Sequence, residues 1–430
     1  MLATLLALPL ALSPVQRTWL VDADPACSAA DFTTIQQAVD AAADGDTIFV
    51  RALPGQAGYE RFVITDKGLR LIGVPIDGVE RVLVEGRSLV LHTGADSAVV
   101  LRGLHMRDEF GPESRLEISG CDGPVWIEDC VIDSRDLFTF GSVGAIEVSF
   151  SDEVAVIGSS VYGFSGLSVF PFLPFDGPGS PAMEVSNGTV AAYDSLFVGG
   201  DAGACASSLG PPGVGYAGSP GVALGDLGVF DAYGCQLVGG DGGSGCGGET
   251  GTGFDPGTPG VGGDALAMAS MSSSAELYAA SFQGGAGSLP GAGGPAGAGS
   301  ANADVLLGTA RTLRTVEPIV AEGGLVQLGY DGGDGDTVLL AFQFEQQHGE
   351  LAGIVGRPLI AVTGPVLPLG IADPNGAVSL AVPVPAGLVP PGTSIGVGAQ
   401  ALGISTQGEA VLTSATWVEL VDLVTGVGDC

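Results

Sequence analysis

Two short charged segments hold the side chains that could do the most chemistry in this sequence, residues 106–109 (MRDE) and 133–136 (DSRD). Each follows a run of apolar and β-branched residues, which indicates that both stand at the end of a short strand. The two segments coincide when Gly103 is aligned with Cys130. Together they hold two arginines and four carboxylates, namely Arg107, Asp108, Glu109, Asp133, Arg135 and Asp136.

In that alignment Arg107 lies over Ser134, and carboxylates of the two segments become close neighbours. Neighbouring carboxylates can bind Ca²⁺ or divide into a general acid and a general base, while an arginine can act as base or hold the substrate carboxylate in a lyase that cleaves uronates. The candidate catalytic residues are Asp108, Glu109, Asp133, Arg135 and Asp136. A solvated ladder of mutually neutralising charges explains the same residues without catalysis.

A further carboxylate group lies near the C-terminus, in residues 331–336 (DGGDGD). Its three acids are separated only by glycine, so their oxygens can converge on one hard cation. The segment lacks the length and the closing glutamate of an EF-hand loop, and a polar hairpin turn explains it equally well. Calcium is therefore the one cofactor that the sequence suggests, with Asp331, Asp334 and Asp336 as candidate ligands.

The charge balance limits the classes of partner. The chain has 430 residues, and its 14 basic against 48 acidic residues give a net charge of −34. Nucleic acids and anionic membrane surfaces are themselves polyanions, so neither is expected to bind. Eleven of the basic residues lie at or before Arg135, and none lies between residues 136 and 310.

A loose repeat must position these charged segments. Short apolar strands recur, each preceded by a small residue and soon followed by glycine. The small residues are Gly103, Cys130, Ser160, Ser195, Cys235 and Ser281, with spacings of 27, 30, 35, 40 and 46. Such units cannot bury their apolar faces alone, so the pattern predicts a solenoid with the small residues stacked inward at a corner. The cysteines in this stack are expected to be buried packing residues.

Residues 32–70 predict the start of the solenoid. Apolar residues at 35, 38, 39 and 42 mark one face of a helix near 33–43, with Asp31 or Thr33 as its cap and Gly45 at its end. The runs at 47–50 and 62–64 then follow as strands. A helix with a single apolar stripe is suited to cover the open end of a stacked sheet.

The string TIQQAVDAAADGDTIFV and the residues that follow it to about 75 resemble the N-terminal cap and first coil of secreted right-handed β-helix proteins of the pectin-lyase-like superfamily. The resemblance implies an all-β fold, a right-handed parallel β-helix with an N-terminal capping α-helix. It says little about reaction, because this fold carries many activities. Residues 125–130 (VWIEDC) also resemble a tryptophan-containing strand near the calcium site of some pectate lyases, which implies Glu128 and Asp129 as candidate ligands. The polygalacturonase signatures and the Arg-x-x-Pro lyase motif are absent.

Three glycine-rich loops leave the repeat at one register, at residues 199–220, 239–263 and 284–300. We expect them to lie side by side, either as a binding surface or as packed polyglycine-type extended strands. Cys205 and Cys246 fall at nearly the same point of adjacent coils, so we predict a disulfide between them. Seven cysteines is an odd number, and Cys430 is the candidate for an unpaired or intermolecular thiol.

The domain plan follows from composition. Residues 1–16 predict a signal peptide, although Pro14 makes the cleavage position uncertain, and no transmembrane segment is expected in the mature chain. Residues 17–302 are predicted to form the β-helix. Short strands between Pro, Gly and Asp turns predict an antiparallel β-sandwich over 303–425, followed by a tail at 426–430. The sandwich would close the C-terminal end of the solenoid, bind a surface or glycan, or act as a spacer.

Two classes of function remain. The first is a secreted or cell-surface β-helix that binds polysaccharide or another extracellular partner, or is structural, without catalysis. The second is a carbohydrate-active enzyme, a polysaccharide lyase or glycoside hydrolase, acting at the cluster around Arg107 and Arg135. An anionic substrate would be repelled by a chain at −34 unless Ca²⁺ bridged the two.

Overall fold

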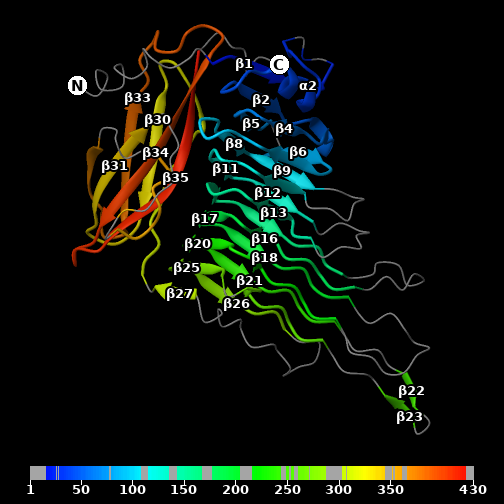
Figure 1. Ribbon diagram of the computed structural model, residues 1–430. Helices are drawn as coiled ribbons and strands as arrows, with labels where there is room; N and C mark the ends of the chain where they lie inside the picture. Colours follow the sequence, from blue (N-terminus) through cyan, green and yellow to red (C-terminus); the bar gives the residue numbers. More distant parts are fainter. Residues whose placement is uncertain are drawn as a thin grey trace.

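The fold is a long stack of coils with a β-sandwich beside it (Figure 1). The computed structural model describes residues 16–422 except 26, 28, 77–78, 108–114, 135–142, 167–176, 204–215, 244–247, 251–252, 256–259, 271, 287–302, 307, 344–350, 352–353 and 361–365. Within this range the predicted right-handed parallel β-helix is confirmed by strand pairing, because successive coils contribute strands to three parallel sheets.

The sheets contain ten, eight and seven strands. The ten-stranded sheet is built from β1 (Thr18–Val21), β2 (Thr47–Arg51), β5 (Arg70–Val74), β8 (Val99–Arg102), β11 (Val125–Glu128), β14 (Val154–Ile157), β17 (Thr189–Tyr193), β20 (Val229–Tyr233), β25 (Ser274–Tyr278) and β27 (Ala303–Leu306). The eight-stranded sheet is built from β3 (Tyr59–Glu60), β6 (Val82–Glu85), β9 (Leu104–Arg107), β12 (Val131–Asp133), β15 (Ser160–Tyr162), β18 (Leu196–Val198), β21 (Gln236–Val238) and β26 (Ser281–Gln283). The seven-stranded sheet is built from β4 (Val63–Thr65), β7 (Ser88–Leu91), β10 (Leu116–Ser119), β13 (Ile146–Ser149), β16 (Met183–Ser186), β19 (Val222–Leu224) and β24 (Leu266–Met268).

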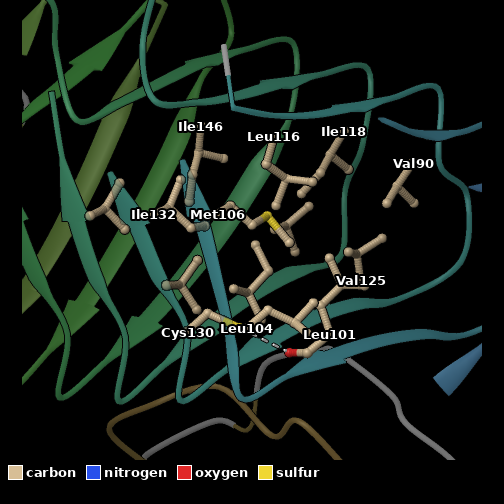
Figure 2. Close-up of a cluster of buried hydrophobic side chains, with 14 of the residues drawn as sticks. Val90, Leu101, Leu104, Met106, Leu116, Ile118, Val125, Cys130, Ile132 and Ile146 are labelled. Carbon is tan, nitrogen blue, oxygen red and sulfur yellow. Dashed lines mark hydrogen bonds between the residues drawn. The ribbon is translucent and has the colours of Figure 1, made fainter. Parts of the chain in front are cut away.

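The interior of the stack is apolar. Inward side chains of the three sheets point toward one another and are almost fully buried (Figure 2), among them Val90, Leu101, Leu104, Met106, Leu116, Ile118, Val125, Ile132 and Ile146. Alternation along each strand produces this arrangement, because residues of one parity face the core while the others face outward. The outward residues of each strand are therefore the ones available for contacts outside the solenoid.

At the corner between the ten- and eight-stranded sheets, the residues of successive coils align differently from the prediction. One residue per coil adopts a left-handed backbone there, namely Gly103, Asp129, Gly158, Asp194, Gly234 and Ala279. Gly103 therefore corresponds to Asp129 and not to Cys130, so the predicted alignment is wrong by one residue. The inward small residues come next, and Cys130 N donates to Ser159 Oγ while Ser159 N donates to Ser195 Oγ, each at 3.1 Å. Burial raises the pKa of Cys130 and Cys235 to about 12, which fits packing residues.

The cap helix α2 (Ile35–Ala41) lies where the sequence predicts it. Its N-cap is Thr34, whose Oγ1 accepts from Gln37 N at 3.3 Å, and neither Asp31 nor Thr33 takes that place. Asp31 instead accepts from Leu20 N at 2.9 Å. The C-terminal carbonyls are bound by Lys67, the one lysine of the sequence, whose Nζ donates to Val39 O and Ala42 O. A short 3-10 turn, η2 (Pro54–Gln56), follows β2.

The C-terminal domain is a sandwich of two sheets, as predicted. One sheet contains β28 (Thr312–Thr315), β30 (Leu325–Asp331) and β33 (Ala377–Pro383). The other contains β29 (Ile319–Ala321), β35 (Ala410–Val421), β34 (Ser394–Ile404), β31 (Thr337–Gln343) and β32 (Val366–Ile371). All its pairs are antiparallel except β29 with β35. The predicted boundary after residue 302 falls one strand early, because β27 still extends the ten-stranded sheet.

The sandwich lies along the side of the solenoid rather than over its C-terminal end (Figure 1). It packs against the outer face of the ten-stranded sheet, where Trp126, Tyr193, Tyr233 and Tyr278 meet Leu359, Ile360, Val411, Ala415 and Trp417. We call this contact the docking seam. At the N-terminal edge of the same sheet, Thr18 N donates to Gly392 O at 3.4 Å. The sandwich therefore covers the outer face of the ten-stranded sheet from β1 to β25 and meets the edge of β1.

The described ends of the glycine-rich loops extend from the side of the solenoid away from the sandwich (Figure 1). Their described legs are extended, and they pack beside the legs of the preceding loop, which joins β15 to β16. We call all these legs the glycine lattice, namely residues 163–166, 177–180, 199–203, 216–221, 239–243, 260–263 and 284–286. Outgoing and returning legs alternate in one chain of backbone hydrogen bonds of 2.7–3.0 Å, from Gly200 N to Ser180 O, Ser219 N to Gly200 O, Gly240 N to Ser219 O, Gly263 N to Gly240 O and Gly285 N to Gly263 O. Cys205 and Cys246, the predicted disulfide, lie outside the described residues. β22 (Gly248–Thr250) and β23 (Gly253–Asp255) pair as a small antiparallel hairpin.

Candidate functional site

Glu128 lies on β11, which is part of the docking seam. The structure therefore does not support the prediction that Glu128 is a calcium ligand. Glu128 is almost fully buried, and its Oε1 accepts from Thr416 Oγ1 at 2.9 Å. Its Oε2 is 3.4 Å from Arg102 Nη1, and the same arginine donates to Trp417 O. Burial raises the pKa of Glu128, and Arg102 opposes that shift. This carboxylate holds two domains together and does not face an open cleft.

Asp129 also has a different partner, because it forms an ion pair with Arg81. It occupies the left-handed corner position at φ 50°, and its Oδ1 is 2.6 Å from Arg81 Nη2. Neither of the two acids that the pectate-lyase resemblance implied as calcium ligands is therefore placed for that role.

The three aspartates of residues 331–336 are not brought together. Asp336 is buried and binds Arg311 through two contacts of 2.7 and 3.2 Å, and it accepts from Tyr330 Oη at 2.6 Å. These hydrogen bonds lower its pKa although burial opposes them. Asp331 and Asp334 point to solvent. Among the described residues, no group of three His, Cys, Asp or Glu side chains is arranged to hold a metal ion.

The charged segments at Arg107 and Asp133 do meet, in a register different from the predicted one. Asp133 pairs directly with Arg107, Arg107 pairs with Glu85 on the preceding coil, and Tyr162 follows Asp133 on the next. We call Glu85, Arg107, Asp133 and Tyr162 the mixed-charge row. Asp108, Glu109, Arg135 and Asp136 lie outside the described residues, so the full predicted cluster is not placed.

The mixed-charge row stands on the outer face of the eight-stranded sheet, at the ends of its strands. Arg107 Nη2 is 3.4 Å from Glu85 Oε1, and successive rows of a parallel sheet are about 4.8 Å apart. Arg107, Asp133 and Tyr162 are half-buried. Among the described residues nothing accepts a hydrogen bond from Arg107 Nε. The row thus presents a cation between two anions, followed by an aromatic hydroxyl.

A second row was not singled out from the sequence. Glu117, Glu147 and Glu184 pair directly on the outer face of the seven-stranded sheet. Beside them Ser149 Oγ donates to Ser119 Oγ at 2.9 Å. The signal was present as a recurring Glu-x-Ser in residues 116–119 (LEIS), 146–149 (IEVS) and 183–186 (MEVS).

We call Glu117, Glu147 and Glu184 the glutamate row. Burial and like-charge repulsion disfavour the ionised forms of its second and third members. Arg87 forms an ion pair with Glu117 at one end of the row. Burial, and then the charge of Glu117, raise the pKa of Glu147, while Arg87 opposes them. Burial, and then Glu147, raise the pKa of Glu184, which a hydrogen bond from Gly144 N–H opposes. The ionised forms of these two acids are therefore less favourable in the folded chain than in the unfolded one.

Replacing Glu147 by glutamine is expected to stabilise the protein at pH 7, by about 0.5 kcal/mol, because it removes like-charge contacts across neighbouring strands. An acid whose native pKa is raised costs stability above that pKa, and the cost disappears as the pH falls toward the unfolded value. The advantage of Glu147→Gln over the wild type should therefore shrink between pH 7 and pH 4.5 in thermal melts. Glu317→Gln, at an exposed site in the sandwich, is the control. An advantage that does not change with pH would contradict the assignment.

Comparisons with known proteins add little. No protein-family model matches the chain, and no curated protein does so. Among solved structures, the enzymatically active domain of tailspike protein 4 from bacteriophage CBA120 aligns at 10% identity and a TM-score of 0.20, covering 87% of this chain and 64% of that one. The chain thus spans less than two thirds of that structure's length. A TM-score this low supports no conclusion, so the fold rests on strand pairing and membership of the pectin-lyase-like superfamily stays a prediction.

Proposed function

We propose that this protein is a secreted or cell-surface β-helix that binds a polysaccharide or another extracellular partner, without catalysis, at the mixed-charge row. The observation that carries the proposal is the row itself, in which Arg107 stands between the carboxylates of Glu85 and Asp133 and next to Tyr162. The outer face of the ten-stranded sheet, with its tryptophan and tyrosines, is occupied by the sandwich. The row lies on a different face of the solenoid.

The chemistry of the row suits a ligand rich in hydroxyl groups. Carboxylates accept and a guanidinium donates charge-assisted hydrogen bonds, so neighbouring hydroxyls of a sugar ring find both kinds of partner. The ring of Tyr162 adds an apolar surface with a polar end. With a net charge of −34, the chain favours neutral or cationic polymers over anionic ones.

An extracellular location is supported by two features. The first 13 residues (MLATLLALPLALS) are an apolar run of the length of a signal-peptide core. Cys27 is disulfide-bonded, and disulfides persist mainly in oxidising compartments. None of the helices in the described part of the chain is long and apolar enough to span a membrane.

A panel of neutral, cationic and anionic polysaccharides, with and without Ca²⁺, tests the proposal. Arg107→Ala and Tyr162→Ala should each weaken binding by about tenfold, a loss of about 1.4 kcal/mol. Arg61→Ala, at an exposed arginine of the same domain, should leave binding unchanged. Equal affinities of the Arg107→Ala and Arg61→Ala variants for the polysaccharide would show that the mixed-charge row is not the binding site.

The same panel tests the alternative of a carbohydrate-active enzyme. Non-catalytic binding predicts no new reducing or unsaturated chain ends after prolonged incubation. Appearance of such ends, and their loss in Asp133→Asn, would favour a lyase or hydrolase acting at the predicted cluster.

A further inference from the structure

Cys27 is disulfide-bonded, so its partner is one of the six other cysteines of the chain. It lies in a turn after β1, where its N–H donates to Asp24 O at 2.9 Å. Its side chain belongs to a small buried cluster that also contains Leu20 of β1, Phe49 of β2, Ile72 of β5 and Val421 of β35. Cys27 thus stands where β35 of the sandwich meets the first coils of the solenoid.

Three of the six other cysteines are excluded directly. Cys121, Cys130 and Cys235 are free thiols buried in the solenoid. Cys205, Cys246 and Cys430 remain, and all three lie outside the described residues. The described residues nearest to each of them along the chain limit how far from Cys27 it can be.

Cys205 is held too far along the stack. Gly203, two residues before it, is fixed to a neighbouring leg of the glycine lattice, because its N–H donates to Gly177 O at 2.9 Å. Two residues span at most about 7 Å, and a disulfide joins Cα atoms at most about 7 Å apart. The coil of this loop contains β17, which is four strands beyond β5 in the ten-stranded sheet, about 19 Å at the usual strand spacing. The loop therefore cannot bring Cys205 to Cys27.

Cys246 belongs to the next coil and is further away. Gly243, three residues before it, donates its N–H to Tyr216 O at 2.9 Å, so this leg too is held at its own coil. Three residues span at most about 10 Å. The coil contains β20, which is five strands beyond β5, about 24 Å along the stack.

We propose that Cys27 and Cys430 form a disulfide that fastens the end of β35 to the first coil. Cys430 is nine residues after Val421, which shares the buried cluster of Cys27. Nine residues span up to about 30 Å, more than the bond requires. The odd number of cysteines is then explained by the three buried thiols, and Cys205 and Cys246 are left for the pair that the sequence predicts.

The bond forms by exchange with a small-molecule disulfide of an oxidising compartment. The thiolate of one of the two cysteines attacks that disulfide, which releases one small thiolate and leaves a mixed disulfide on the protein. The thiolate of the other cysteine then attacks the protein sulfur and displaces the second small thiolate. Two protein thiols are thereby oxidised, the small disulfide is reduced to two thiols, and the two protons of the protein thiols pass to them.

The disulfide adds a covalent link to weak contacts between the sandwich and the first coils. Thr18 N donates to Gly392 O at 3.4 Å, and Ser394 Oγ donates to Thr47 Oγ1 at 2.9 Å. These hydrogen bonds can open one at a time, whereas the disulfide keeps the end of β35 at the first coil when they do. Because a reductant breaks the bond, the firmness of this contact depends on the redox state of the surroundings.

Peptide mapping identifies the partner of Cys27. The monomer band of a non-reducing gel is digested with trypsin and a glutamate-specific protease after free thiols have been alkylated. Cleavage places Cys27 in residues 18–51, Cys430 in residues 420–430, and both Cys205 and Cys246 in residues 185–249. Mass spectrometry should find the first two peptides linked, and the link should disappear on reduction. A link from residues 18–51 to residues 185–249, or an alkylated Cys430, would overturn the proposal.

Stability provides a second test. Cys430→Ser should raise the unfolding equilibrium constant in urea at least about thirtyfold, the lower end of what removing a native disulfide costs. Adding Cys430→Ser to Cys27→Ser should change nothing further, because the bond is already absent. A reductant should lower the urea midpoint of the wild type more than that of the double variant, a comparison that cancels any other disulfide. Additive losses, or equal responses to the reductant, would contradict the pairing.

Discussion

Replacing Trp417 by alanine is expected to cost about 3–5 kcal/mol of the free energy of unfolding, as large aromatic truncations in a core do. Trp417 is almost fully buried and meets Trp126 of the solenoid edge to face, with ring centroids 5.7 Å apart. Its backbone also holds Glu128 and Arg102. The loss should therefore appear in the unfolding of the whole chain, measured by far-ultraviolet circular dichroism in urea, and not in the sandwich alone.

Leu325→Ala provides the matched control for Trp417→Ala, because it removes a large apolar side chain that is 48% exposed in the same domain. Its effect should stay within about 0.5 kcal/mol. A Trp417→Ala protein whose solenoid unfolds at the wild-type urea concentration would show that the two domains are stable independently. Combining it with Trp126→Ala should give a cost smaller than the sum of the two, because the residues are in contact.

The reason for a shared transition is the path of β35 across the coils. Its residues meet successive coils of the ten-stranded sheet, with Val421 near Leu20, Phe49 and Ile72, Glu419 at Arg70, and Trp417 at Arg102 and Glu128. Arg70 Nε is 2.7 Å from Glu419 Oε1 in a largely buried pair. Removing one partner of such a pair costs about 3–5 kcal/mol, because the other charge is left buried. One strand thereby joins coils that otherwise contact only their neighbours.

Local patterns made the solenoid predictable. The cap helix follows from apolar residues at helical spacing, and the strands follow from β-branched runs between glycines, so both can be found without tertiary contacts. The register failed by one residue because the prediction aligned small side chains. Gly103 and Asp129 share a backbone conformation, not a side-chain size. Aspartate is one of the few residues besides glycine that adopt the left-handed region, so an alignment based on side-chain size passes over it.

The docking seam could not be predicted for a different reason. Glu128 and Trp417 are 289 residues apart, and each sits in a strand that looks ordinary by itself. Nothing periodic connects them, and a glutamate next to an aspartate suggests a metal ligand as readily as a buried ion pair. The glutamate row, in contrast, was visible as a repeated Glu-x-Ser. A row of like charges does not match the mixture of acidic and basic residues that predicts acid–base chemistry.

Gly240→Ala is expected to open the glycine lattice. An added methyl group would stand 2.0 Å from Gly200 O and 2.4 Å from its carbonyl carbon, which no side-chain movement can relieve. The backbone must shift, and the hydrogen bonds from Gly240 N to Ser219 O and from Gly263 N to Gly240 O would be lost. With about 1 kcal/mol for each bond, the cost should be at least about 2 kcal/mol, before any strain in the neighbouring legs. Hydrogen exchange should show lost protection at residues 216–221 and 239–243.

Gly177→Ala separates this packing effect from the general effect of replacing a glycine. Gly177 belongs to the same lattice, but a methyl group there would meet nothing within 4 Å. Reduced freedom of the unfolded chain should then stabilise the protein by about 0.4–1 kcal/mol. If Gly240→Ala were tolerated as well as Gly177→Ala, the legs could not be packed this closely in solution. If Gly240→Ala destabilises the protein and Gly177→Ala stabilises it, the close packing of neighbouring loops depends on the absence of side chains.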